Sequence, residues 1–111
     1  MNEIEIIKLH KMLNEANIPH TFTDNMFKDC SLYPSYQIII KKDGTRLCDA
    51  IYHFSSYGYW DGLLEIMGGL TKEERENDEV LGHLTADEVF KRFKYCYENN
   101  TSLYKEVLED E

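Results

Sequence analysis

The sequence predicts an α+β fold, with a small two- or three-stranded antiparallel sheet packed by an N-terminal helix and two or three C-terminal helices. Three observations predict it: an amphipathic stretch at residues 3–16, a hairpin pattern at 36–54, and helical patterns after residue 60. Helices segregated from one small antiparallel sheet define this class. We expect a single domain over residues 1–111, because this length fits one core and 42% of the residues are hydrophobic.

The first element is a helix over residues 3–16, in which apolar side chains recur at spacings of three and four. Asn17 suits the left-handed position after a helix, Ile18 can fold back on the last turn, and Pro19 prevents continuation. Residues 20–23 then alternate polar and apolar side chains and predict a short strand that suits a sheet edge, followed by a loop over residues 24–35. The apolar face of the predicted helix over residues 3–16 comprises Ile6, Leu9, Leu13 and Ala16.

The clearest hairpin lies within residues 36–54, and two registers are open. A two-residue Asp-Gly turn would place Asp49 opposite Ile38. A three-residue loop with Gly44 in a bulge would pair Ile38 with Cys48. We favour the second register because it keeps the apolar side chains together on one face. That face would hold Tyr36, Ile38, Cys48, Ala50 and Tyr52.

Three further helical segments follow the hairpin. Residues 60–67 predict a short helix, because Trp60, Leu63, Leu64 and Met67 share one helical face. Residues 71–78 are charged, and the Thr-x-x-Glu spacing at their start predicts a capped turn or two of exposed helix. The last helix has the strongest start signal, with a Thr85 N-cap completed by Glu88, and it ends at a pair of asparagines.

The charge balance excludes several classes of partner. The chain has 12 Lys and Arg against 21 Asp and Glu, a net charge of −9 at pH 7. Such a chain repels phosphate, so we expect neither direct nucleic-acid binding nor attraction to an anionic membrane. No apolar run reaches the length of a membrane span, and the first residues lack a signal-peptide pattern. Three cysteines without a CxxC pair favour reduced thiols, so the predicted location is the cytoplasm.

Catalytic and metal sites are not predicted. The four histidines, His10, His20, His53 and His83, do not pair at metal-ligand spacing, and no cysteine lies within four residues of one of them. Cys48 and Cys96 fall on core positions. No nucleophile elbow, HExxH motif or phosphate-binding loop occurs in the sequence. We therefore expect no enzymatic activity, no metal and no cofactor.

Two features are candidate contacts with a partner protein. Tyr57 and Tyr59 flank Gly58 in a predicted loop, where interface and packing roles have equal weight, whereas Trp60 is expected in the core. The charged stretch at residues 71–80 is either an ordinary solvated face or an array of carboxylates that occupies a cationic groove. Its acids are Glu73, Glu74, Glu76, Asp78 and Glu79.

Residues 58–98 also resemble a known group of proteins. The similar segments are YGYWDGLLEIMG at 57–68, EERENDEV at 73–80 and GHLTADEVFKRFK at 82–94. They resemble small proteins carried by phages and prophages of Gram-positive bacteria, a group with no known activity. The resemblance implies a mobile-element context and, for a phage-encoded protein, the host cytoplasm. It carries over no functional residue.

These observations favour a non-enzymatic, acidic protein-interaction module of phage type. The expected partner is a basic protein surface, and the specific hypothesis is inhibition of a host nucleic-acid-binding defence protein, as anti-CRISPR proteins do. One alternative is a small-ligand or nucleotide-binding module that uses the Tyr-rich loop and a pocket between the sheet and the helix at 60–67. The other is a self-associating structural protein. The oligomeric state is not indicated by the sequence.

Overall fold

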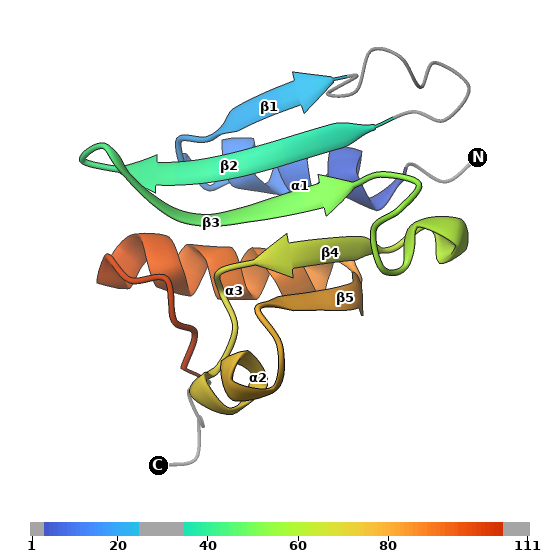
Figure 1. Ribbon diagram of the computed structural model, residues 1–111. Coiled ribbons are helices and arrows are strands. Elements are labelled where there is room, and N and C mark those ends of the chain that lie inside the picture. The colour runs from blue at the N-terminus through green and yellow to red at the C-terminus, as the bar shows by residue number, and fades with distance from the viewer. Residues whose placement is uncertain (1–3, 25–34, 106–111) are drawn as a thin grey trace, which may run out of the picture.

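A five-stranded antiparallel sheet in the order β1-β2-β3-β4-β5 is the centre of the fold. The computed structural model describes residues 4–24 and 35–105. Figure 1 shows α1 and α3 lying together behind the sheet and α2 at its lower end. The predicted α+β class is confirmed, with more strands than expected. The elements are α1 (Glu5–Glu15), β1 (Thr21–Asp24), β2 (Tyr36–Lys42), β3 (Thr45–Tyr52), the 3-10 turn η1 (Tyr59–Asp61), β4 (Leu64–Met67), α2 (Lys72–Asn77), β5 (Val80–Leu84) and α3 (Ala86–Asn99).

Helix α1 ends as its sequence predicts. Asn17 adopts the left-handed conformation (φ 58°), which reverses the chain after the last turn. The Ile18 N–H then donates to the Leu13 carbonyl oxygen at 2.9 Å, and the Ile18 side chain is buried. The chain therefore turns directly into β1, which among the described strands pairs with β2 alone and comes first in the strand order.

The hairpin of β2 and β3 has the predicted faces but not the favoured register. Its turn is the two-residue Asp43-Gly44 type, with both φ angles positive (54° and 80°), and a bulge then shifts the pairing. Ile38 consequently pairs with Ala50 rather than with Cys48 or Asp49. The turn follows local Asp-Gly chemistry, whereas the bulge restores the alternation that keeps apolar side chains on one face.

The helix predicted over residues 60–67 is wrong. A single 3-10 turn, η1, ends at Gly62, which has a left-handed backbone (φ 76°). Residues 64–67 form β4, in which Ile66 pairs with Ala50 of β3. Leu64 and Ile66 are buried while Glu65 and Met67 lie on the opposite face, so the alternation of a strand outweighs the helical spacing.

Both predicted capping boxes are present, and an additional strand lies between them. Thr71 begins α2 and Thr85 begins α3, each with its side chain accepting the N–H of the glutamate three residues on. Helix α3 ends at Asn100, which is left-handed (φ 55°). Strand β5 joins the two helices and pairs with β4, which completes the sheet.

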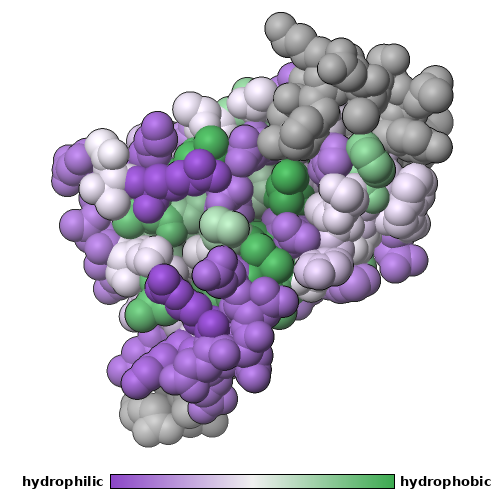
Figure 2. Space-filling view, viewed as in Figure 1, coloured by the Kyte–Doolittle hydropathy of each residue, from purple (hydrophilic) through white to green (hydrophobic). Residues whose placement is uncertain are grey.

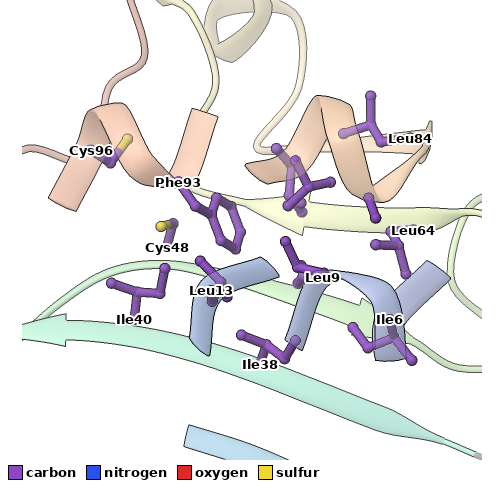
Figure 3. Packing of buried hydrophobic residues seen from close by; sticks show 14 of the residues in the cluster. Ile6, Leu9, Leu13, Ile38, Ile40, Cys48, Leu64, Leu84, Phe93 and Cys96 are labelled. Atoms are coloured by element: carbon purple, nitrogen blue, oxygen red, sulfur yellow. The ribbon is translucent and has the colours of Figure 1, made fainter. Parts of the chain in front are cut away.

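The core fills the space between the sheet and the two long helices. Figure 3 shows Phe93 of α3 extending toward Leu13 of α1, and Ile38 and Ile40 of β2 below them. Within the described residues, both long helices pack on this same face of the sheet. We call the other face the open face; Figure 2 shows apolar side chains there among hydrophilic ones. Pairing and alternation place Gln37, Ile39, Asp49, Ile51, Glu65, Met67 and Val80 on it.

Candidate functional site

The predicted acidic residues lie on α2 and at the turn into β5, where Figure 2 shows a hydrophilic lower end. Glu73, Glu76 and Glu79 are exposed. Asp78 is also exposed, and its Oδ1 accepts the N–H groups of Glu79 at 2.7 Å and Val80 at 3.4 Å. Asp78 thus shapes the turn while its carboxylate stays at the surface.

Glu74 has a structural position that sets it apart from the other acids. Its Oε1 accepts the Thr71 N–H at 2.8 Å, which closes the capping box. The Arg92 guanidinium donates to Oε1 at 2.7 Å and to Oε2 at 3.1 Å. These bonds with Arg92, aided by the Thr71 N–H, lower the pKa of Glu74 despite its partial burial. Glu74 therefore anchors α2 to α3, and both of its oxygens are already bonded.

Tyr57 is held by its backbone and presents its ring. Its N–H donates to Glu65 Oε1 at 2.9 Å, and its carbonyl oxygen accepts the His83 N–H at 3.2 Å. A Cβ atom at Gly82 would lie within 2.9 Å of the Tyr57 carbonyl oxygen, so the absence of a side chain there permits this close approach. The Tyr57 side chain remains 56% exposed.

A surface depression of about 370 Å³ brings two of the predicted contacts together. Tyr57 lines it together with Asn77, the last residue of α2, and Asp78, the next residue. Glu74 also lines it, although both of its carboxylate oxygens are bonded to Arg92. An aromatic ring beside a carboxylate is a favourable environment for a lysine or arginine side chain.

The structure decides between the two roles left open for Tyr59 and contradicts the core position expected for Trp60. Tyr59 is only 7% exposed, and its ring packs 4.4 Å from that of Tyr52, so it serves packing and is not presented to a partner. Trp60, expected in the core, is 70% exposed and meets Tyr59 edge to face at 5.0 Å. The reason is η1: one tight turn directs adjacent side chains to different sides. The nucleotide pocket expected beside a helix at 60–67 loses one wall, because β4 replaces the second half of that helix and η1 part of the first.

The fold pairs two histidines that the sequence separates by ten residues. His10 Nδ1 lies 2.8 Å from His20 Nε2, and His20 Nδ1 lies 2.9 Å from the Ile18 carbonyl oxygen. A carbonyl oxygen only accepts, so His20 carries its proton on Nδ1 and accepts from His10 Nδ1–H. Burial and the neighbouring His20 lower the pKa of His10. The described residues contain no group of three or more metal-ligating side chains around this pair or elsewhere.

The cysteines offer no accessible nucleophile within the described part of the chain. Cys48 and Cys96 are buried as free thiols in the core between β3 and α3, as predicted (Figure 3). The adjacent Cys96 thiol and burial raise the pKa of Cys48, which keeps it protonated. Cys30 and the loop predicted around it lie outside the described residues, apart from that loop's two ends.

Comparisons with known proteins identify no relative of this chain. No protein family model matches the chain, and neither a curated protein nor a solved structure matches it. Among the helices of residues 4–24 and 35–105, none has the length and apolar character needed to cross a membrane.

Proposed function

We propose that this protein is a non-enzymatic interaction module that binds a basic protein surface through its acidic end. The acidic end comprises the exposed Glu73, Glu76, Asp78 and Glu79 together with the exposed ring of Tyr57. The observation that carries the proposal is the depression of about 370 Å³ that Tyr57 and Asp78 line together. Glu74 is omitted from the contact set because Arg92 occupies both of its oxygens.

The chemistry of the depression suits a cationic side chain. A lysine or arginine of the partner would lie against the Tyr57 ring and donate to the Asp78 carboxylate, whose Oδ2 accepts no hydrogen bond from the described residues. The surrounding carboxylates would stay partly hydrated at the rim of such an interface. Rim charges of this kind act mainly on the association rate and on its salt dependence. The net charge of −9 extends the same attraction to longer range.

We extend the proposal to the class of partner. Proteins that bind nucleic acids neutralise phosphates with clustered lysine and arginine side chains, and the acidic end offers carboxylates in place of those phosphates. The mobile-element context implied by the resemblance favours a host defence protein of this class, inhibited in the manner of anti-CRISPR proteins. Duplex DNA would then compete with this protein for the same partner.

Charge reversal with a matched control tests the proposal. Proteins captured from a Gram-positive bacterial lysate at low salt and eluted at high salt are identified and purified, and their affinity is then measured. The triple variant Glu73→Lys, Glu76→Lys, Glu79→Lys is expected to weaken binding at least about tenfold and to flatten its salt dependence. The control Glu15→Lys, Asp24→Lys, Glu98→Lys makes the same change in net charge at exposed positions on α1, β1 and α3.

The comparison of the two triple variants shows whether the position of the acidic residues matters or only the net charge. Equal losses in the two triple variants would show that net charge alone attracts the partner, and an unchanged affinity in the acidic-end variant would refute the proposal. Tyr57→Ala, compared with Trp60→Ala as a second exposed aromatic residue, tests the anchor separately. Competition by duplex DNA tests the partner class, and its failure would leave only the general basic surface.

A further inference from the structure

A second pocket, of about 330 Å³, opens beside Asp49 on the open face. Its apolar lining comes from Leu47, Met67 and Leu70, which lie on β3, on β4 and just after β4. This volume is at the lower end of the range of about 300–1,000 Å³ that is usual for small-molecule sites. An apolar floor with a few charged groups around it is also usual for such sites.

Asp49 gives this pocket a nearly buried charge. The residue is 7% exposed, although it lies on the open face. Its Oδ2 accepts from Gln37 Nε2 at 3.1 Å and forms an ion pair with Arg46 Nη2 at 3.0 Å. Its Oδ1 accepts no hydrogen bond from any residue that the structure describes. A carboxylate oxygen that lines a pocket and has no donor there can accept a hydrogen bond from a ligand.

The rim of the pocket carries charges of both signs. Arg75 of α2 and Glu79, at the turn into β5, line it and are exposed. Neither side chain forms an ion pair with another residue in the described ranges. Arg46 already neutralises Asp49 through Oδ2. The groups left for a ligand are thus Asp49 Oδ1, the Glu79 carboxylate and the Arg75 guanidinium, placed around an apolar floor.

We propose that this pocket binds a small zwitterion of the apolar α-amino acid class. Its ammonium group would donate to Asp49 Oδ1, its carboxylate would accept from the Arg75 guanidinium, and its side chain would lie on Leu47, Met67 and Leu70. The proposal does not depend on a basic protein partner, because it rests on a different pocket. Glu79 belongs to both surfaces, so the tests below leave it unchanged.

Half-ligands, which are compounds that lack one charged group of the amino acid, test the ammonium and carboxylate contacts separately, and glycine tests the apolar contact. The probes are l-leucine, l-methionine and l-phenylalanine, with 4-methylpentanoate lacking the ammonium group, 3-methylbutylamine lacking the carboxylate, and glycine lacking the apolar side chain. Amide chemical-shift titrations of the isotopically labelled full chain measure each affinity. At least one of the three amino acids is expected to shift amides of residues 46–49 and 67–70 saturably. Each half-ligand and glycine should bind at least about tenfold more weakly.

Two variants assign the charged contacts. Asp49→Asn, which keeps the shape of the side chain, is expected to weaken the amino acid and 3-methylbutylamine but not 4-methylpentanoate. Arg75→Gln is expected to weaken the amino acid and 4-methylpentanoate but not 3-methylbutylamine. Asp61→Asn and Lys72→Gln are exposed controls of the same charge types, the second on the same helix as Arg75, and should change nothing.

The outcomes that overturn this proposal are distinct from those that bear on the protein partner. No saturable shift with any of the three amino acids refutes it, and so do half-ligands that bind as tightly as the intact zwitterion. If Asp49→Asn does not fold, the exposed Arg75→Gln variant still decides the carboxylate contact. Both variants keep Glu73, Glu76 and Asp78, so binding of a basic partner is expected to persist in them.

Discussion

Glu74 and Arg92 join the short helix α2 to the long helix α3 through two parallel contacts, Oε1–Nη1 at 2.7 Å and Oε2–Nη2 at 3.1 Å. The same arginine donates to the Gly69 carbonyl oxygen at 3.0 Å and lies over the Tyr104 ring. One side chain therefore ties α2, the turn after β4 and the segment after α3 together. This arrangement holds α2, a helix of only six residues that carries Glu73 and Glu76 of the acidic end.

Glu74→Ala is expected to destabilise the protein by about 2–3 kcal/mol, because it removes the Glu74 half of the capping box and leaves the Arg92 guanidinium without its carboxylate partner. The Arg92 side chain is only 12% exposed, so water replaces the lost carboxylate poorly. Urea unfolding measures the change. Glu76→Ala, an exposed acid on the same helix, should stay within about 0.5 kcal/mol of the parent. Equal effects in the two variants would contradict the anchoring role of Glu74.

The contribution of Glu74 should also depend on acid pH. Its pKa in the folded protein lies below the unfolded value of 4.5, chiefly because of the bonds with Arg92. Its stabilisation is thus complete above pH 4.5 and is lost as the pH falls toward the folded pKa. The difference in unfolding free energy between the parent and Glu74→Gln should be constant near neutral pH and shrink below pH 4.5. A difference that grew on acidification would refute this.

The His10–His20 pair predicts a second pH effect, in a higher range. Burial and the proximity of His20 hold the pKa of His10 below its usual value of 6.5. The unfolded chain therefore binds more protons, so stability is full above pH 6.5 and falls as the pH drops below it. His10→Gln should reduce this loss between pH 7 and 5, as measured by thermal unfolding across that range. An identical pH dependence in the parent and the variant would exclude His10 as the cause.

Gly68 and Gly62 allow the cost of a clash to be separated from the cost of a left-handed backbone. Both have φ 76°, but a Cβ at Gly62 meets nothing within 4 Å, whereas one at Gly68 lies 2.8 Å from Cys48 Cα. Gly62→Ala should cost about 1–2 kcal/mol for the backbone alone. Gly68→Ala should cost a further 1–3 kcal/mol or so, because β3 has to move away. Equal unfolding free energies for the two variants would show that β3 moves freely.

Tyr59 and Trp60 form a matched pair of adjacent aromatic residues. Tyr59→Ala is expected to cost about 3 kcal/mol, because it leaves a cavity beside Tyr52. Trp60→Ala should cost about 1 kcal/mol or less, since the residue is 70% exposed and little buried apolar area is lost. Denaturant unfolding of both variants measures the difference. A larger loss at Trp60 would place that ring in the core after all.

Signals within a few residues of each other predicted their elements correctly. Asn17 ends α1, and Thr85 with Glu88 begins α3, because the atoms that stop or cap a helix lie within one turn of it. The faces of β2 and β3 were likewise predicted from alternation alone. The register was not, because the Asp-Gly turn and the apolar alternation favour different pairings, and the bulge that reconciles them has no strong signature in the sequence.

The short strands β4 and β5 could not be predicted from their own residues, because pairing with neighbouring strands determines them. Residues 64–67 fit a helical face as well as a strand, and the free edge of β3 decides between them. The candidate sites depended on the fold in the same way. The acidic stretch was found from composition. The Thr-x-x-Glu spacing marks Glu74 as a capping residue, but nothing local indicates that it also binds Arg92 while Glu73 and Glu76 face solvent. The pocket beside Asp49 was not foreseen at all.

The sequence by itself determined where α1 ends, where α3 begins and ends, which side chains of the hairpin share a face, and that the chain is strongly acidic. Helix ends and strand faces depend on the conformation of a few neighbouring residues. The net charge depends on the composition of the whole chain. Tertiary structure alone decided the number of strands, the pairing of His10 with His20 and the burial of Asp49. Each of these depends on groups from distant segments, whose contact becomes favourable only once the core has placed them side by side.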